Sequence, residues 1–269
     1  MEKIKHNQRL FRIFWDKRIT AACRRAGVYP VPSNICDPIG KGDFMDQIRI
    51  FPAGDSPAVA YAAQLLKQKG ISVTSENATH ILLNVPSKPA DIPPNTTVIG
   101  GNLSWLNPEV RRIDLLREER YVAENAHLTA DCAIRLLGQH LPCSFRACPV
   151  LIIGWGRIGK CLAALLKDLD AAVAVAARKE TDLAMLAAFG YEAVRMDQIR
   201  PEKYRAIINT APAPVLGAGE GLRIDLASQK GIDGENVIWA RSLPGKMLPE
   251  SSGKLIAGAV LRHLREDCI

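Results

Sequence analysis

The stretch VLIIGWGRIGKCLAALL, residues 150–166, passes from an apolar run into three glycines and then into an amphipathic segment. Gly154, Gly156 and Gly159 spell GxGxxG between a predicted strand and a predicted helix, which is the context that a dinucleotide fingerprint requires. Gly154 permits the tight turn, Gly156 lets the backbone approach a pyrophosphate, and Gly159 lets the helix pack against the sheet. Free N–H groups at the helix start attract the phosphate charge. The stretch therefore predicts a dinucleotide-binding turn rather than a glycine turn that only packs.

A strand–helix alternation extends outward from this turn in both directions. In the second half we expect strands at 149–153, 172–177, 205–209, 222–226 and 236–240, and helices at 157–169, 180–189 and about 252–265. In the first half we expect strands at 48–51, 71–74, 80–85 and 96–101, and helices at 56–69 and from near Thr129. Such alternation is typical of parallel sheets covered by helices. The expected fold class is α/β, a doubly wound parallel-sheet Rossmann domain plus a second, smaller α/β domain.

The length of 269 residues also favours two domains. The expected segments are a basic N-terminal extension (1–45), a small α/β domain for substrate or partner (46–125), an interdomain helix and linker (126–146), the Rossmann domain (147–250) and a C-terminal helix (251–269).

The net charge of +7 is concentrated at the N-terminus, because residues 1–25 hold eight basic and two acidic side chains. The spacing of Leu10, Ile13 and Phe14 predicts a short amphipathic helix there, docked on its own protein or on a partner protein. Nucleic-acid binding is disfavoured because no reader motif accompanies the charge. No apolar run is long enough to span a membrane, and no signal peptide is recognisable, so we expect a cytoplasmic protein.

The seven cysteines show no CxxC pair and no spacing typical of zinc ligands. We therefore expect no metal site and no disulfide framework, and interpret the cysteines as reduced thiols that mostly pack. Cys143 and Cys148 are close in sequence, but a redox pairing is disfavoured because no neighbouring residue would lower a thiol pKa.

The end of the strand at 172–177 bears on which dinucleotide is bound. NAD sites usually place an acidic residue there to bind the ribose, whereas this chain has Arg178 and Lys179. A guanidinium can bind a 2′-phosphate with two hydrogen bonds. Glu180 and Asp182 are the competing acids, but they fit better as first-turn residues of the next helix. The sequence thus favours NADP over NAD.

Further segments resemble one family. INTAP (208–212), DLAS (225–228) and SLPGKMLPESSG (242–253), spaced after the glycine turn, together resemble the A subunit of bacterial dipicolinate synthase. ENAHLTADCAI (124–134) resembles the interdomain hinge of that family. The resemblance covers roughly residues 120–265 and is more specific than the glycine motif alone.

The resemblance implies an NADP-dependent oxidation of dihydrodipicolinate to dipicolinate during sporulation, with a flavoprotein-like B subunit as a partner. We also expect a homo-oligomer. The expected cofactor-binding residues are Gly154, Trp155, Gly156, Arg157, Ile158, Gly159, Arg178, Lys179, Asn209, Thr210, Ala211, Pro212, Ala227, Ser228, Leu243, Pro244 and Gly245.

A dicarboxylate substrate needs cations, and Lys246 is the first candidate, ahead of Lys254 and Arg157. Each of these side chains could equally be a solvated surface charge. Loss of a hydride that yields an aromatic ring requires mainly positioning and one proton acceptor. His127 or Asp131 is the expected acceptor, with hinge packing as the alternative role. The resemblance also places Asn125 and Thr129 at the substrate.

Two rival functions stay open. A D-2-hydroxy-acid dehydrogenase would need a catalytic histidine late in the Rossmann domain, but no histidine lies between residues 141 and 262. A non-catalytic NADP-binding regulatory or scaffold protein would keep the glycine turn and lose the substrate residues of the poorly matching first domain.

Overall fold

The computed structural model describes residues 47–217 and 219–266, so the expected N-terminal extension and its amphipathic helix lie outside the described residues. The described chain forms two compact units. The glycine-turn unit comprises residues 137–225 and 230–237, and the N-terminal unit comprises residues 47–136, 226–229 and 238–266.

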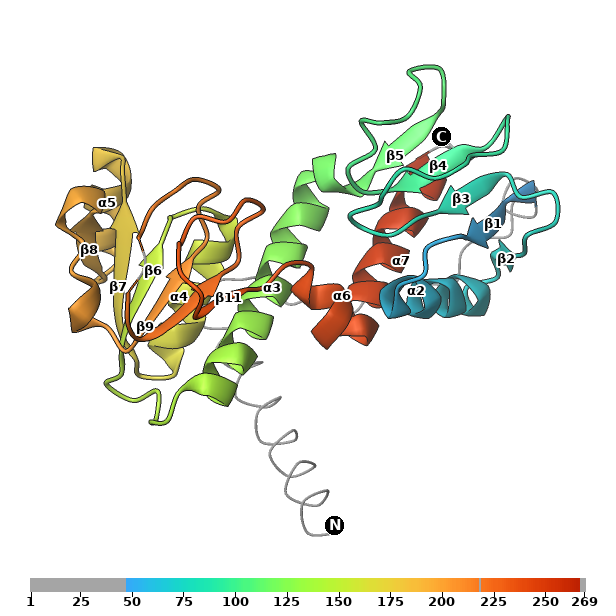
Figure 1. The fold of residues 1–269 in the computed structure, drawn as a ribbon. Coiled ribbons are helices and arrows are strands. Elements are labelled where there is room, and N and C mark those ends of the chain that lie inside the picture. Colours follow the sequence, from blue (N-terminus) through green and yellow to red (C-terminus); the bar gives the residue numbers. More distant parts are fainter. Residues whose placement is uncertain (1–46, 218, 267–269) are drawn as a thin grey trace, which may run out of the picture. The chain divides into compact units, whose positions relative to one another are not determined.

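Within the described residues, the sheet of the glycine-turn unit has six strands. They are β6 (Pro149–Ile153), β7 (Ala172–Ala177), β8 (Glu192–Arg195), β9 (Ala206–Asn209), β10 (Leu222–Asp225) and β11 (Val237–Trp239). Their order is β11-β10-β9-β6-β7-β8 (Figure 1), which is the order 3-2-1-4-5-6 of the Rossmann fold when counted from β8. The pairs β6–β7, β7–β8, β6–β9 and β9–β10 are all parallel. The expected doubly wound α/β fold is confirmed.

Two helices of this unit follow the glycine turn and the next strand. Helix α4 (Arg157–Asp168) buries one face against the sheet, because its apolar side chains Leu162, Leu165 and Leu166 recur at helical spacing. Helix α5 (Glu180–Ala188) packs beside β7 and β8. The short strand β8 was not expected from the sequence, since it is only four residues long and mostly exposed.

The N-terminal unit is a second parallel sheet. Its described strands are β1 (Arg49–Pro52), β2 (Ser72–Val73), β3 (His80–Leu82), β4 (Thr97–Gly100) and β5 (Arg112–Asp114). They are arranged in the order β2-β1-β3-β4-β5 with parallel pairing throughout, which is the other common doubly wound order. Strand β5 was not expected, because it is only three residues long and two of them are charged.

Helices α2 (Pro57–Gln68) and α7 (Pro249–Glu266) pack in one hydrophobic core with β1 and lie side by side in Figure 1. Val59 and Leu66 on α2 and Val260 and Leu264 on α7 are fully buried. The C-terminal helix is thus part of the N-terminal unit, whereas the sequence suggested a separate segment at 251–269. Residues 226–229 and 238–250, expected within the Rossmann domain, also belong to this unit.

Helix α3 (Glu119–His140) begins about ten residues before the expected start near Thr129. Its first two turns carry charged side chains such as Glu119, Arg120 and Glu124, and this polarity masked the helical period. Residues 243–247, for which the sequence predicted no helix or strand, form a short helix, α6 (Leu243–Met247). None of the helices in the described part of the chain is long and apolar enough to cross a membrane.

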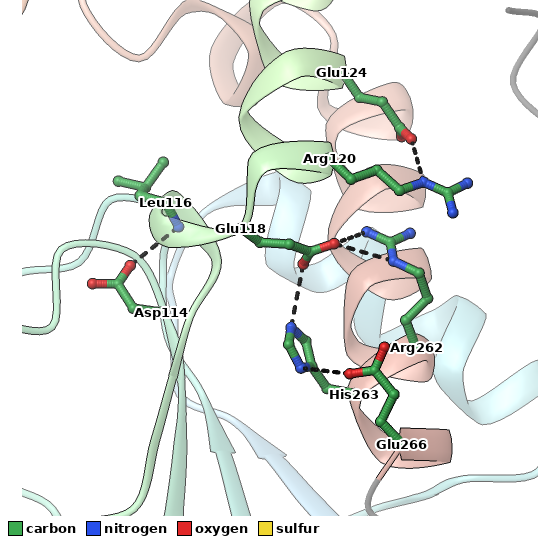
Figure 2. A network of polar contacts seen from close by, with 8 residues as sticks. All are labelled: Asp114, Leu116, Glu118, Arg120, Glu124, Arg262, His263 and Glu266. Atoms are coloured by element: carbon green, nitrogen blue, oxygen red, sulfur yellow. Dashed lines mark hydrogen bonds and ion pairs between the residues drawn. The ribbon is translucent and has the colours of Figure 1, made fainter.

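A polar network joins α7 to the residue that precedes α3 (Figure 2). The Glu118 carboxylate accepts hydrogen bonds from Arg262 Nη2 at 2.5 Å and Nε at 3.1 Å, and its other oxygen lies 3.3 Å from His263 Nε2. Nearby, Asp114 Oδ1 accepts a hydrogen bond from the Leu116 backbone N–H at 3.1 Å. Charge-assisted contacts of this kind are stronger than neutral hydrogen bonds. They fix the start of α3 on the N-terminal unit.

Candidate functional site

The glycine turn is held by Thr210, the residue that follows the neighbouring strand β9. The Thr210 backbone N–H and its Oγ1 both donate to the Ile153 carbonyl, at 2.8 Å and 3.0 Å. Gly154, the residue after Ile153, has a φ of +104°, and a Cβ at this position would lie 2.7 Å from Thr210 Oγ1. Only glycine adopts this conformation without strain and leaves room for Thr210. The end of β9 therefore shapes the turn after β6.

The two remaining glycines differ in their surroundings. A Cβ at Gly159 would collide with the Gly154 carbonyl oxygen, so the close passage of α4 beside the turn requires glycine. A Cβ at Gly156 would meet nothing within 4 Å, and no side chain caps the start of α4. The backbone at Gly156 thus faces open space. These features fit a pyrophosphate, which would occupy that space and accept hydrogen bonds from the helix start.

A buried carboxylate organises the next loops of this sheet edge. Asp225, at the end of β10, is fully buried and accepts hydrogen bonds from the backbone N–H groups of Gly231 at 2.6 Å and Ile232 at 3.0 Å. Asn209 Nδ2 donates to the same carboxylate at 3.0 Å, and Asn209 Oδ1 accepts from the Ala211 N–H at 2.9 Å. The network fixes the loop that follows β9.

Ala227 and Ser228 of DLAS are expected from the sequence to bind the cofactor, whereas no role was expected for Asp225. The sequence does place an acid near the end of a predicted strand. A carboxylate buried at such a position is stable only if hydrogen-bond donors or a cation compensate its charge, so Asp225 could have been recognised as a structural residue. The structure places Asn209, Thr210 and Ala211 together with Asp225 at the carboxyl end of β9 and β10. Pro212 follows in the same loop.

Arg178 and Lys179 follow β7 directly and are exposed. Within the described residues neither side chain makes an ion pair. The competing acid Glu180 lies 3.2 Å from Arg195 Nη1, and Arg195 Nε lies 3.5 Å from Asp197. Arg195 is on β8 directly opposite Ala177, so it stands beside the position where the 2′-phosphate is expected. Glu180 and Asp197 are thus engaged by a cation of the adjacent strand.

Trp155, at the variable position of the glycine motif, has partners of its own. Its ring makes an edge-on contact with Tyr191 with centroids 5.7 Å apart, and Lys160 Nζ lies 5.8 Å from the Trp155 centroid. Burial, and secondarily the charge of Asp168, raises the pKa of Tyr191, which keeps its hydroxyl protonated. The neighbouring motif residues Arg157 and Ile158 form the first turn of α4.

The expected hinge residues lie along α3 in the N-terminal unit. Thr129 is buried, and its Oγ1 donates to the Asn125 carbonyl at 2.8 Å. Asp131 lies 3.4 Å from Arg135 and is paired with it. Burial lowers the pKa of His127, although the Asp131 charge acts in the opposite direction. His127 is therefore held as a neutral imidazole, a form that accepts protons.

The remaining expected residues also belong to the N-terminal unit. Leu243, Pro244 and Gly245 form the first turn of α6, after Ser242 at a φ of +54°. Lys246 follows on the same helix and makes no ion pair within the described residues, whereas Lys254 is bound to Glu250 at 2.7 Å. Lys246 is thus the better carboxylate ligand of the two. The described residues contain no group of His, Cys, Asp and Glu side chains that could hold a metal ion.

No protein-family model matches this sequence, and no curated protein sequence matches it. Solved structures do match. The A subunit of dipicolinate synthase from Bacillus halodurans has a TM-score of 0.69 at 20% identity, over 83% of this chain and 99% of that one. This chain shares the fold of that dipicolinate synthase protein. The resemblance seen in the sequence is confirmed at that level.

Two further structures extend the comparison. The dipicolinate synthase A chain from Bacillus subtilis has a TM-score of 0.66 at 19% identity, over 82% of this chain and 97% of that one. A transhydrogenase from Sinorhizobium meliloti has a TM-score of 0.64 at 14% identity, over 81% of this chain and 94% of that one. Proteins with different reaction names therefore share this two-unit α/β fold.

We predict that Asp225→Asn lowers the free energy of unfolding by about 1–3 kcal/mol, because an amide cannot accept from both Gly231 and Ile232 and from Asn209 as a carboxylate does. Urea denaturation measures the change. Asp233→Asn, at an exposed site of the same loop, is the matched control and is expected to change it by less than about 0.5 kcal/mol. Equal effects of the two variants would show that the buried network does not stabilise the loop.

Proposed function

We propose that this protein is an NADP-dependent oxidoreductase of small dicarboxylates, with dihydrodipicolinate as substrate and dipicolinate as product. The observation that carries the proposal is the glycine turn of a Rossmann sheet together with the residues that follow the next strand, β7. Arg178 and Lys179 supply two cations there, and the acid after them, Glu180, is already paired with Arg195. The fold shared with two dipicolinate synthase A chains supports the choice of substrate.

Cofactor binding is assigned to residues of the glycine-turn unit. The open backbone at Gly156 and the uncapped start of α4 receive the pyrophosphate. Arg178 and Lys179 bind the 2′-phosphate, with the Arg178 guanidinium able to donate two parallel hydrogen bonds. Thr210 and Asn209 keep the turn and the following loop in shape for this ligand.

The reaction removes a hydride and a proton from the substrate and leaves an aromatic ring. The nicotinamide, when bound, accepts the hydride. We assign the proton to His127, because burial favours the neutral imidazole, whereas Asp131 is engaged by Arg135. Lys246 binds a substrate carboxylate, and Asn125 and Thr129 orient the substrate at α3. Positioning is the main demand, because aromatisation itself drives the reaction.

An assay of NADPH formation from dihydrodipicolinate, with and without a flavoprotein-like B subunit, tests the proposal directly. Turnover is expected in at least one of the two conditions. Tight NADPH binding without turnover in either would instead support a non-catalytic NADP-binding protein.

We predict that Arg178→Gln weakens NADPH binding by about 10- to 100-fold and leaves NADH binding unchanged, because only NADPH carries the 2′-phosphate. Isothermal titration calorimetry with both nucleotides measures the ratio. Arg200→Gln, an exposed arginine of the same unit, is the control and is expected to alter neither affinity. Tighter binding of NADH than of NADPH by the unaltered protein would refute the NADP assignment.

The ion pair between Arg195 and Glu180 offsets the negative charge of Glu180 beside the proposed 2′-phosphate site. Arg195→Gln releases the Glu180 carboxylate beside the 2′-phosphate, and we expect NADPH affinity to fall by about two- to fivefold. Adding Glu180→Gln to that variant restores the affinity, because the repulsive charge is then gone. A double variant that binds NADPH as weakly as Arg195→Gln would mean that Arg195 contacts the phosphate itself.

The lowered pKa of His127 gives a pH prediction with a definite sign. The base must be neutral, so kcat/KM stays constant at neutral pH and falls only as the pH drops through a value below the usual 6.5 or so. In His127→Gln this acidic limb disappears and the rate falls by about 100-fold or more. His140→Gln, an exposed histidine at the end of the same helix, is expected to keep both rate and profile. An unchanged limb in His127→Gln would reassign the proton acceptor.

A further inference from the structure

Two thiols face each other in the segment between α3 and β6, which holds none of the residues assigned to cofactor or substrate. The Sγ atoms of Cys143 and Cys148 are 3.8 Å apart. Cys143 is exposed, whereas Cys148 is buried with 4% of its surface accessible. The sequence disfavoured a redox role for this pair because no neighbouring residue would lower a thiol pKa, but the structure brings the two sulfur atoms into contact.

The backbone of this segment holds the two cysteines at that distance. The Cys148 N–H donates to the Phe145 carbonyl at 2.9 Å, which closes a turn between the two thiols. The Ala147 N–H donates to the Asp170 carbonyl at 2.7 Å, and Ala147 has a φ of +55°. Because the contact is set by short side chains on a bonded turn, rotation about the Cα–Cβ bonds can bring the sulfur atoms to the roughly 2 Å of a disulfide.

The two thiols differ in the part they can take in oxidation. Burial, with a smaller contribution from the Cys143 thiol, raises the pKa of Cys148 to about 11, so Cys148 stays protonated at neutral pH. Cys143 is the thiol that a dissolved oxidant can reach. Exposure is one of the conditions that select which cysteine is oxidised. Cys143 is thus the first sulfur to react, and Cys148 the second.

We propose that Cys143 and Cys148 form a modification site that hydrogen peroxide converts to an intramolecular disulfide. The Cys143 thiolate attacks one peroxide oxygen, the O–O bond breaks, and a sulfenic acid and hydroxide form. The Cys148 sulfur then attacks the Cys143 sulfur, and the sulfenic oxygen leaves as water with the Cys148 proton. The two sulfur atoms are oxidised by two electrons in total, and the peroxide is reduced to water.

The site lies at the amino end of β6, whereas the glycine turn follows the carboxyl end of that strand. A disulfide here would close a short ring in the segment that leads into β6 and would restrict that segment in the unfolded chain. We therefore expect oxidation to raise the melting temperature of the protein and to leave nucleotide binding unchanged. The inference does not depend on the proposed reaction.

Tryptic mapping of the full-length protein after treatment with hydrogen peroxide tests the proposal. Cleavage after Arg146 separates the two cysteines, so a disulfide joins the peptides 136–146 and 147–157. The expected product is this linked pair, lighter by two hydrogen atoms than its separate peptides and split by dithiothreitol. Its yield should be independent of protein concentration, because the bond forms within one chain.

Cys143→Ser and Cys148→Ser are expected to abolish the linked pair. Cys161→Ser removes another thiol of the same unit and is the matched control, expected to retain it. Oxidation of Cys143 only to sulfinic acid, with no linked peptides in the unaltered protein, would overturn the proposal. A link that forms only between two protein molecules would overturn it as well.

Discussion

The two hydrogen bonds from Thr210 to the Ile153 carbonyl are the constraint on which the carboxyl edge of the Rossmann sheet depends. They join the end of β9 to the end of β6 at the point where the chain must turn into α4. From the same strand, Asn209 reaches Asp225 on β10, and Asp225 in turn holds the loop at Gly231. A continuous series of hydrogen bonds thus runs across three strand ends. It fixes the backbone against which a nucleotide would lie.

The sequence predicted the central strands well, because β6 and β7 are apolar runs bounded by turn residues, and the bounds 149–153 and 172–177 agree with the structure. Strands β5 and β8 were missed because both are short edge strands with charged residues, and such segments lack a hydrophobic period. The start of α3 was missed for the same reason.

The sequence predicted only those parts of the candidate site whose residues lie close together in the chain. The glycine turn and Arg178 could be read from local sequence and spacing. The pairing of Glu180 with Arg195 could not, because the two residues are fifteen positions apart and meet only through the register of β7 and β8. The contacts of Asp225 with the loop at 231–232 likewise depend on the fold of that loop.

The fold does not choose the reaction, since a transhydrogenase and a dipicolinate synthase protein share it with this chain. The reaction therefore depends on the side chains that this chain places on the fold. This chain carries a partly buried histidine with a lowered pKa on α3, a lysine on α6 and paired acids beside β7.

The three glycines of the turn are present for two different physical reasons. Gly154 and Gly159 are required by the chain itself, one for its backbone conformation and the other for the approach of α4 to the turn. Gly156 has an ordinary extended backbone with φ −80° and open space where a side chain would be. Folding therefore requires glycine at the first two positions and leaves room for a side chain at the third. A side chain at Gly156 would instead enter the space that the proposed pyrophosphate occupies.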